Sequence, residues 1–193
     1  MYNNRFTIIP KIVQPPLLDG YLNDEVWTKA DRLRDFTTIY YLKPAQLCTE
    51  VRLIYDEENL YIGIMCEYGE DKQGDDPDEI EILISPDSSG RSYVQVTLND
   101  LGCFNILGAE LGLKRGADKK YMVQAIKENN FWSAEIAVPF TAFGIERIYI
   151  GDEWRLNVIR RTLPRSSWMP IRQVYDEDTY GIQGRRRTAQ LCV

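Results

Sequence analysis

Hydrophobic and polar residues alternate along several short stretches of the chain, and this spacing predicts β-strands. The clearest stretch is residues 78–85, where three isoleucines occupy alternate positions. Because successive side chains of a strand point to opposite faces, the isoleucines predict a core face, and Glu79 and Glu81 fall on the other face. Carboxylates on a rigid strand suit polyhydroxyl groups or a hard cation. From this strand alone, a solvent-facing half of a sheet beside a hydrophilic loop is the favoured interpretation.

The same alternation recurs at short spacing through the rest of the chain. It predicts strands at residues 6–12, 46–55, 60–68, 93–99, 102–107, 121–127, 131–138, 154–163 and 188–193. A short helix is expected over Glu25 to Ala30, where Trp27 is the anchor, and one helical turn is expected over Pro139 to Gly144. Many short strands with almost no helix indicate an all-β fold, a two-sheet antiparallel β-sandwich of jelly-roll type with one or two short helices. Because no linker or internal repeat interrupts the pattern, we expect residues 1–193 to form one domain.

Composition and charge restrict the classes of partner. The chain has 193 residues and a net charge of −6, whereas nucleic acids and anionic membranes call for a basic surface. No apolar run is long enough to predict a membrane span. The first residues lack the apolar segment of a signal peptide, so we expect an intracellular protein or a mature fragment.

Histidine is absent from the sequence, and this excludes several kinds of chemistry. Catalytic arrangements that use a histidine base, zinc sites that use imidazole and histidine-ligated haem are all impossible. The cysteines have no C-x-x-C spacing, which argues against an all-cysteine zinc site. Because histidine is also absent, we expect neither zinc nor haem as a cofactor. Cys48 and Cys66 lie across a predicted hairpin but point to its opposite faces, so we expect free, partly buried thiols.

Seven short motifs follow one another in an order that is specific when they are taken together. They span Asp19–Ala30, Thr49–Asp56, Leu60–Ile62, Asp78–Ile82, Tyr93–Gln95, Trp132–Phe140 and Trp154–Arg160. This order resembles that of family 9 carbohydrate-binding modules, a branch of the DOMON-like β-sandwiches. The resemblance implies a non-catalytic module that binds the ends of plant-wall glucans or xylans. It also implies an extracellular or periplasmic location and a fused or associated glycoside hydrolase.

The resemblance further implies which residues bind the sugar. Glu81 is similar in position to the family's sugar-binding glutamate, Arg160 to an arginine near the cleft, and Trp168 to one of two tryptophans that sandwich a sugar ring. Sugar chemistry agrees, because an aromatic ring offers a flat apolar surface while carboxylates, amides and guanidinium groups hydrogen-bond to hydroxyls. The predicted ligand-binding residues are Glu79, Glu81, Gln95, Asn157, Arg160 and Trp168. As alternatives, Trp168 packs under its loop, and Glu81 forms a structural salt bridge with Arg160 or Arg161.

The acidic segment before residue 79 suggests a cation site. Asp75, Asp76 and Asp78 carry the oxygen ligands that calcium prefers, and the resemblance implies structural calcium. Their spacing is not that of an EF-hand, so a solvated loop is an equal alternative.

The sequence also departs from the family, because residues 74–77 lack the second tryptophan expected before Asp78. A β-sandwich that has lost sugar binding and acts as a spacer or interaction domain is therefore the main alternative function. A glycoside hydrolase that uses Glu79 and Glu81 as paired carboxylates is a further alternative, which the small sandwich fold disfavours. A haem-carrying electron-transfer domain is disfavoured by the absence of histidine.

Overall fold

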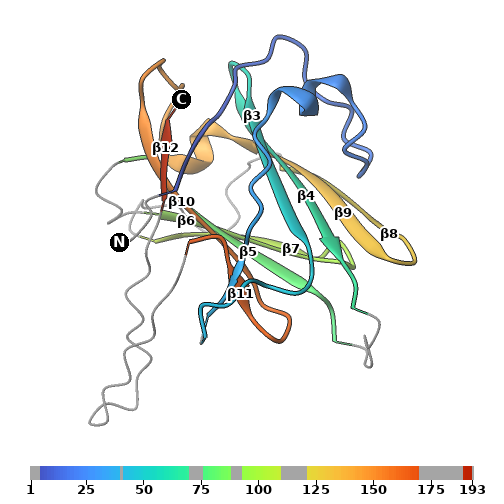
Figure 1. Cartoon of the computed structure of the whole chain (residues 1–193). Helices are drawn as coiled ribbons and strands as arrows, with labels where there is room; N and C mark the ends of the chain where they lie inside the picture. Colours follow the sequence, from blue (N-terminus) through green and yellow to red (C-terminus); the bar gives the residue numbers. More distant parts are fainter. Residues whose placement is uncertain are drawn as a thin grey trace.

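Two β-sheets pack face to face in the computed structural model (Figure 1). The structure describes residues 5–39, 41–69, 76–87, 93–109, 121–169 and 189–192. Sheet A has the strand order β1 (Phe6–Ile8), β12 (Ala189–Cys192), β10 (Glu153–Arg160), β5 (Glu79–Ser85), β6 (Tyr93–Asn99) and β7 (Phe104–Ala109). A side branch adds β11 (Ser166–Ser167) and β2 (Thr37–Thr38) next to β10. Sheet B has the order β3 (Thr49–Tyr55), β4 (Asn59–Glu67), β9 (Phe131–Pro139) and β8 (Met122–Lys127).

The predicted all-β sandwich is confirmed, and neighbouring strands are antiparallel except for β1 and β12, which run parallel. The first strand is shorter than the sequence predicts and ends at Ile8. After Pro10 the chain crosses to sheet B, where Ile12 N donates to the carbonyl of Tyr55 at 2.7 Å. Residues 6–12 therefore serve both sheets, because their first part extends one sheet edge and their last part extends the other.

The core lies between the sheets and is built by the alternating residues that the sequence indicates. Ile80, Ile82 and Ile84 are fully buried there, together with Trp132 and Trp154. Their burial confirms that the isoleucine face of β5 is the inner face. Glu79 and Glu81 consequently lie on the outer face of sheet A.

The outer face of sheet B is covered by the N-terminal segment. The 3-10 helix η1 (Glu25–Lys29) carries Trp27, which is buried in a cluster with Ile54 and Tyr61. Gly63 lies beneath this tryptophan, and a Cβ there would come within 3.2 Å of the Trp27 ring and 2.5 Å of Leu22. The predicted role of Trp27 as the anchor of this helix is confirmed.

A buried carboxylate on β9 fixes that covering segment. Glu135 accepts hydrogen bonds from Trp27 Nε1 at 2.7 Å and from the backbone nitrogens of Asp19 and Gly20, both at 2.9 Å. Burial raises the pKa of Glu135, although these three donors act in the opposite direction. The segment is thus attached to sheet B by polar contacts as well as by packing.

The second predicted helical turn is present as η2 (Phe140–Phe143). Gly144 ends it with a φ of 75°, a left-handed conformation that favours glycine. Among the described residues, no helix is long and apolar enough to cross a membrane.

Cys48, which is half-buried, and Cys66, which is buried, are free thiols as expected. Cys103 is a free thiol that is exposed, and the side chain of Cys192 lies outside the described part of the chain. Cys66 lies opposite Thr49 in the pairing of β3 with β4, so Cys48 points to the other face of the hairpin. Burial raises the pKa of the Cys66 thiol.

Candidate functional site

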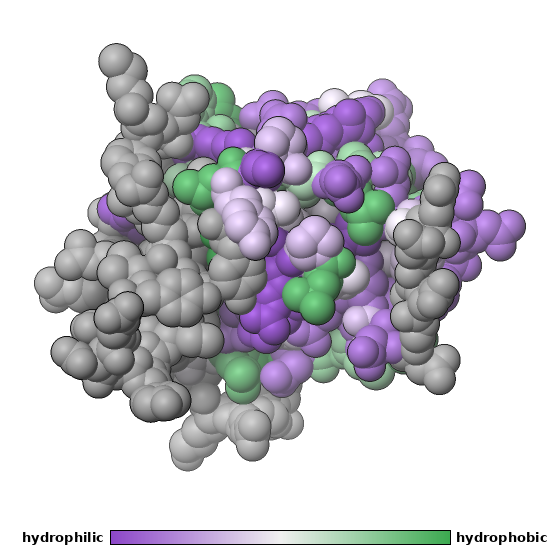
Figure 2. Space-filling view, turned by 60° about the horizontal axis from the view of Figure 1, so that its bottom comes forward, coloured by the Kyte–Doolittle hydropathy of each residue, from purple (hydrophilic) through white to green (hydrophobic). Residues whose placement is uncertain are grey.

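Polar side chains form a strip across the outer face of sheet A. In one row of the sheet, Glu81 of β5 lies opposite Ile159 of β10 and Thr97 of β6, and Thr97 lies opposite Asn105 of β7. Paired residues of antiparallel strands point to the same side of a sheet, so these side chains share one surface. Figure 2 looks toward this side of the molecule and shows hydrophilic residues gathered over its middle, with hydrophobic residues between them.

Two glutamates and one arginine form the charged centre of the strip. Arg161, which directly follows β10, donates from Nε and Nη2 to one oxygen of Glu81 at 3.0 and 2.7 Å. Its Nε also lies 3.3 Å from Glu79 Oε1. Glu81 is almost fully buried, whereas the Arg161 side chain is 42% exposed. The arginine is thus oriented by the glutamates and still reaches solvent.

An apolar patch adjoins this charged centre. Leu83 and Ile159 point outward next to Glu81 and are covered by Ile39, with Tyr93 packed against them. Ile39 begins a tight turn that is closed by a hydrogen bond from Thr38 N to the carbonyl of Lys43 at 2.8 Å. Tyr41 in this turn is 78% exposed. The turn is thus attached to the outer face of sheet A through Ile39 and carries an exposed aromatic residue.

Gln95 and Asn157 lie on the same outer face but differ in accessibility. Gln95 is half-buried on β6, one row from Thr97. Asn157 is fully buried, and its Oδ1 accepts a hydrogen bond from Met169 N at 2.9 Å. Asn157 therefore positions the segment that follows β11, while Gln95 is accessible from solvent.

Arg160 points away from this face, contrary to its predicted place in a binding cleft. It lies on the inner side of β10 and donates to Asp78, to Thr49 Oγ1 at 3.2 Å and to the backbone carbonyls of Cys48 and Glu67. These acceptors belong to both sheets, so Arg160 is a buried cross-link of the sandwich. The physical reason is alternation, because Trp154, Leu156 and Val158 of the same strand also face the core.

Asp78 is the partner of Arg160, and both of its oxygens are engaged. One accepts from Arg160 Nε at 3.1 Å and from Thr162, and the other accepts from Arg160 Nη2 at 2.5 Å and from Trp132 Nε1 at 2.8 Å. Burial on its own would raise the pKa of Asp78, but the hydrogen bonds from Arg160, Thr162 and Trp132 lower it below the ordinary value. Asp78 is therefore committed to the protein interior.

This placement corrects the predicted calcium site at Asp78, since a carboxylate with four protein donors does not fit a metal ligand. Asp76 is exposed, and Asp75 lies outside the described residues. Within the described ranges, no three acidic or cysteine side chains are grouped so that they could hold a metal ion. Calcium bound near this segment would need ligands other than Asp78.

Trp168 is only 4% exposed and belongs to the core cluster. Its backbone nitrogen donates to the carbonyl of Val158 at 2.9 Å, and the guanidinium of Arg5 lies 5.9 Å from the centre of its ring. An exposed platform for a sugar is thus not present at Trp168. The alternative that the sequence left open, packing under its loop, describes its position.

Arg161, Thr97 and Asn105 complete the polar strip but are absent from the predicted binding set. Arg161 was detectable, because alternation along residues 154–161 places Arg160 with the core residues and Arg161 on the opposite face. The salt bridge between Glu81 and Arg161, considered from the sequence, is present. Asn105 needed the pairing of β6 with β7, which the spacing of residues 102–107 alone did not define.

Comparisons with known proteins agree with this architecture. The sequence matches no protein-family model and has no significant match among curated proteins. Two solved structures of a family 9 carbohydrate-binding module from Caldicellulosiruptor kristjanssonii, one with cellotriose and one with glucose, superpose with a TM-score of 0.63 at 11% identity. The alignments cover 97% of this chain and 93% and 95% of the modules. A candidate carbohydrate-binding protein from Bacteroides uniformis superposes with a TM-score of 0.69 at 12% identity, covering 98% of this chain and 99% of that protein.

At such low identity the comparisons establish the fold and not the ligand. The chain has the β-sandwich fold of family 9 carbohydrate-binding modules, as its order of motifs indicates.

Proposed function

We propose that this protein is a non-catalytic carbohydrate-binding module and that it binds neutral oligosaccharides on the outer face of sheet A. The polar strip centred on Glu79, Glu81 and Arg161 carries the proposal, because its charged groups are held by one another and Arg161 still reaches solvent. The structural neighbours with bound cellotriose and glucose support a sugar as the ligand.

The chemistry of the strip suits sugar hydroxyl groups. Carboxylates accept hydrogen bonds and guanidinium groups donate them, so a pair of vicinal hydroxyls can bridge Glu79 and Arg161. Gln95 and Thr97 add neutral donors and acceptors on the neighbouring strand. The exposed ring of Tyr41 supplies a surface on which the apolar face of a pyranose can stack.

Binding without hydrolysis is the role that this arrangement favours. Glu79 and Glu81 both interact with the same guanidinium group, so neither is poised as a separate acid or nucleophile. We propose ends of plant-type glucans or xylans as ligands and a role in supporting polysaccharide degradation by an associated glycoside hydrolase.

Calorimetric titration with cellotriose tests the proposal. Arg161→Ala removes a charge-assisted donor, a contact of about 1.5–3 kcal/mol, and we expect the Kd to rise roughly tenfold or more. Tyr41→Ala should raise the Kd about fivefold through loss of stacking. Glucose and xylotriose, titrated in parallel, define the preferred sugar.

Arg147→Ala is the matched control for Arg161→Ala. Arg147 is also an exposed arginine, but it precedes β10 at the opposite end of that strand and lies over Tyr149. This control should leave the Kd unchanged. If folded wild-type protein binds none of these glycans, the proposal is wrong, and a spacer or interaction domain becomes the better assignment.

A further inference from the structure

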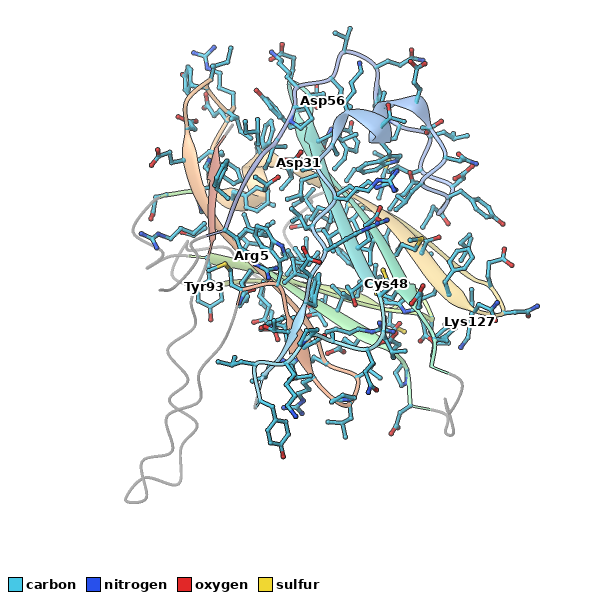
Figure 3. All side chains as sticks on the ribbon, viewed as in Figure 1. Arg5, Asp31, Cys48, Asp56, Tyr93 and Lys127 are labelled. Atoms are coloured by element: carbon cyan, nitrogen blue, oxygen red, sulfur yellow. The ribbon has the colours of Figure 1, made fainter. Side chains whose placement is uncertain are left out.

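A groove of about 570 Å³ lies at the edge of the sandwich, between the start of β1 and the segment 31–35. This volume is within the range of roughly 300–1,000 Å³ found for small-molecule sites. Arg5 and Asp31, which both line the groove, are labelled in Figure 3. The groove is separate from the polar strip, since Phe6, Thr7 and residues 31–35 line it together with the edge of Trp168.

Arginines dominate the charge of this groove. Arg5, Arg32 and Arg34 all line it, and the Arg5 guanidinium donates to the backbone carbonyl of Arg34 at 3.1 Å. The acidic lining residues are Asp31, which accepts from Thr7 Oγ1 at 2.9 Å, and Asp35, which is exposed. The Thr7 contact holds Asp31 at the wall of the groove. The arginines therefore outnumber the carboxylates at a protein surface that is acidic overall.

A buried carboxylate holds one of these arginines, Arg34, together with Arg52, which is not part of the groove lining. Glu50 of β3 is fully buried and accepts from Arg34 Nε and from Arg52 Nε, both at 2.5 Å. Arg32 Nε lies 3.9 Å from the same carboxylate. Burial on its own would raise the pKa of Glu50, but the hydrogen bonds from Arg34 and Arg52 lower it, so Glu50 is ionised at neutral pH.

Arg32, Arg34 and Arg52 thus share the single carboxylate of Glu50, whose charge neutralises only one of the three guanidinium groups. Arg32 keeps the weakest of the three contacts, and its side chain is 54% exposed. Arg34 is fixed at Glu50 by its Nε side, and its side chain is 44% exposed. The groove therefore holds Arg34, fixed by Glu50, and Arg32 close to the same carboxylate, both reaching solvent, and such guanidinium groups match the oxygens of a carboxylate or a sulfate.

We infer that this groove is a second binding site, which recognises an anionic group on a sugar chain, either the carboxylate of a uronic acid unit or a sulfate ester. The carbohydrate part of this inference rests on the proposed function. That the ligand carries an anionic group is inferred from the arginines of the groove, Arg5, Arg32 and Arg34.

Calorimetric titration with trigalacturonate, a sulfated trisaccharide and cellotriose tests this site. The wild type should bind at least one acidic glycan at the groove. Its affinity for that glycan should fall as the salt concentration rises from roughly 50 to 300 mM, because salt screens exposed charges. Arg32→Ala should weaken acidic-glycan binding about fivefold or more, and Arg32→Glu should weaken it further. Neither variant should change the Kd for cellotriose.

Arg147→Ala again serves as the control, and Arg161→Ala separates the two sites. Acidic-glycan binding that survives in Arg161→Ala and is lost in Arg32→Glu supports the groove as the binding site. This holds even if cellotriose does not bind at all. The comparison between carboxylated and sulfated glycans identifies the anion. Acidic-glycan binding that is equal in Arg32→Glu and Arg147→Ala, or absent from the wild type, would overturn the inference.

Discussion

The two sheets of this sandwich use the same kind of residue on their outer faces for opposite purposes. On sheet B, buried Glu135 binds Trp27 and two backbone nitrogens, and the N-terminal segment covers the face. On sheet A, buried Glu81 binds Arg161, whose side chain reaches solvent. A carboxylate whose donors are themselves buried stabilises the fold. A carboxylate whose donor is exposed leaves that donor available to a ligand.

Removing the anchor of the covered face should have the largest effect. Trp27→Ala deletes a fully buried aromatic side chain, and we expect the free energy of unfolding to fall by about 3–5 kcal/mol. Urea denaturation followed by circular dichroism measures this change. A loss below about 1 kcal/mol would mean that the N-terminal segment contributes little to sheet B.

A smaller loss of stability is expected when a larger side chain is introduced under the segment that covers sheet B. Gly63→Val places methyl groups where even a Cβ would meet Leu22 and the Trp27 ring. We therefore expect the free energy of unfolding to fall by about 1–3 kcal/mol. The same urea experiment tests it. Ala125→Val on β8, the edge strand of the same sheet, is a comparison at a half-buried position that adds two carbons away from Leu22 and Trp27.

The pH dependence of stability should separate the two kinds of buried carboxylate. The pKa of Asp78 is lowered, so its contribution is present above its ordinary value of 3.8 and is lost as the pH falls through the folded-state pKa. The pKa of Glu135 is raised, so its contribution is greatest below 4.5 and declines as the pH rises through the folded-state pKa.

Urea titrations between pH 2.5 and 8 measure both effects. Glu135→Gln should flatten the decline on the neutral side, and Asp78→Asn should flatten the decline on the acidic side. Identical pH profiles for wild type and Glu135→Gln would contradict the assigned shift.

The smallest change in stability is expected on the open face. Tyr41 is largely exposed, so Tyr41→Ala should change the free energy of unfolding by less than about 0.5 kcal/mol. The same variant is expected to weaken cellotriose binding, so stability and binding separate at this residue. A loss of stability comparable to that of Trp27→Ala would show that the turn at Tyr41 belongs to the core.

The strand pattern and the sandwich were predictable from the sequence because alternation depends on neighbouring residues only. The same rule applied to residues 154–161 would have distinguished Arg160 from Arg161. The burial of Trp168 depends on contacts with β10 and Arg5 that are distant in sequence. The commitment of Asp78 to Arg160, Thr162 and Trp132 likewise needed the assembled sheets. Sequence therefore located the polar face but could not identify which charged groups the fold uses internally.

The pairing of β1 with β12 has a consequence for how the protein acquires its structure. Phe6 lies opposite Gln190, so within the described residues the strand that pairs with β1 comes almost a chain length later. During synthesis, sheet B and the β5–β6–β7 meander can form while β1 still lacks its partner, because their contacts are closer in sequence. We expect the β1 edge to be the last part of the sandwich to gain protection from hydrogen exchange during refolding.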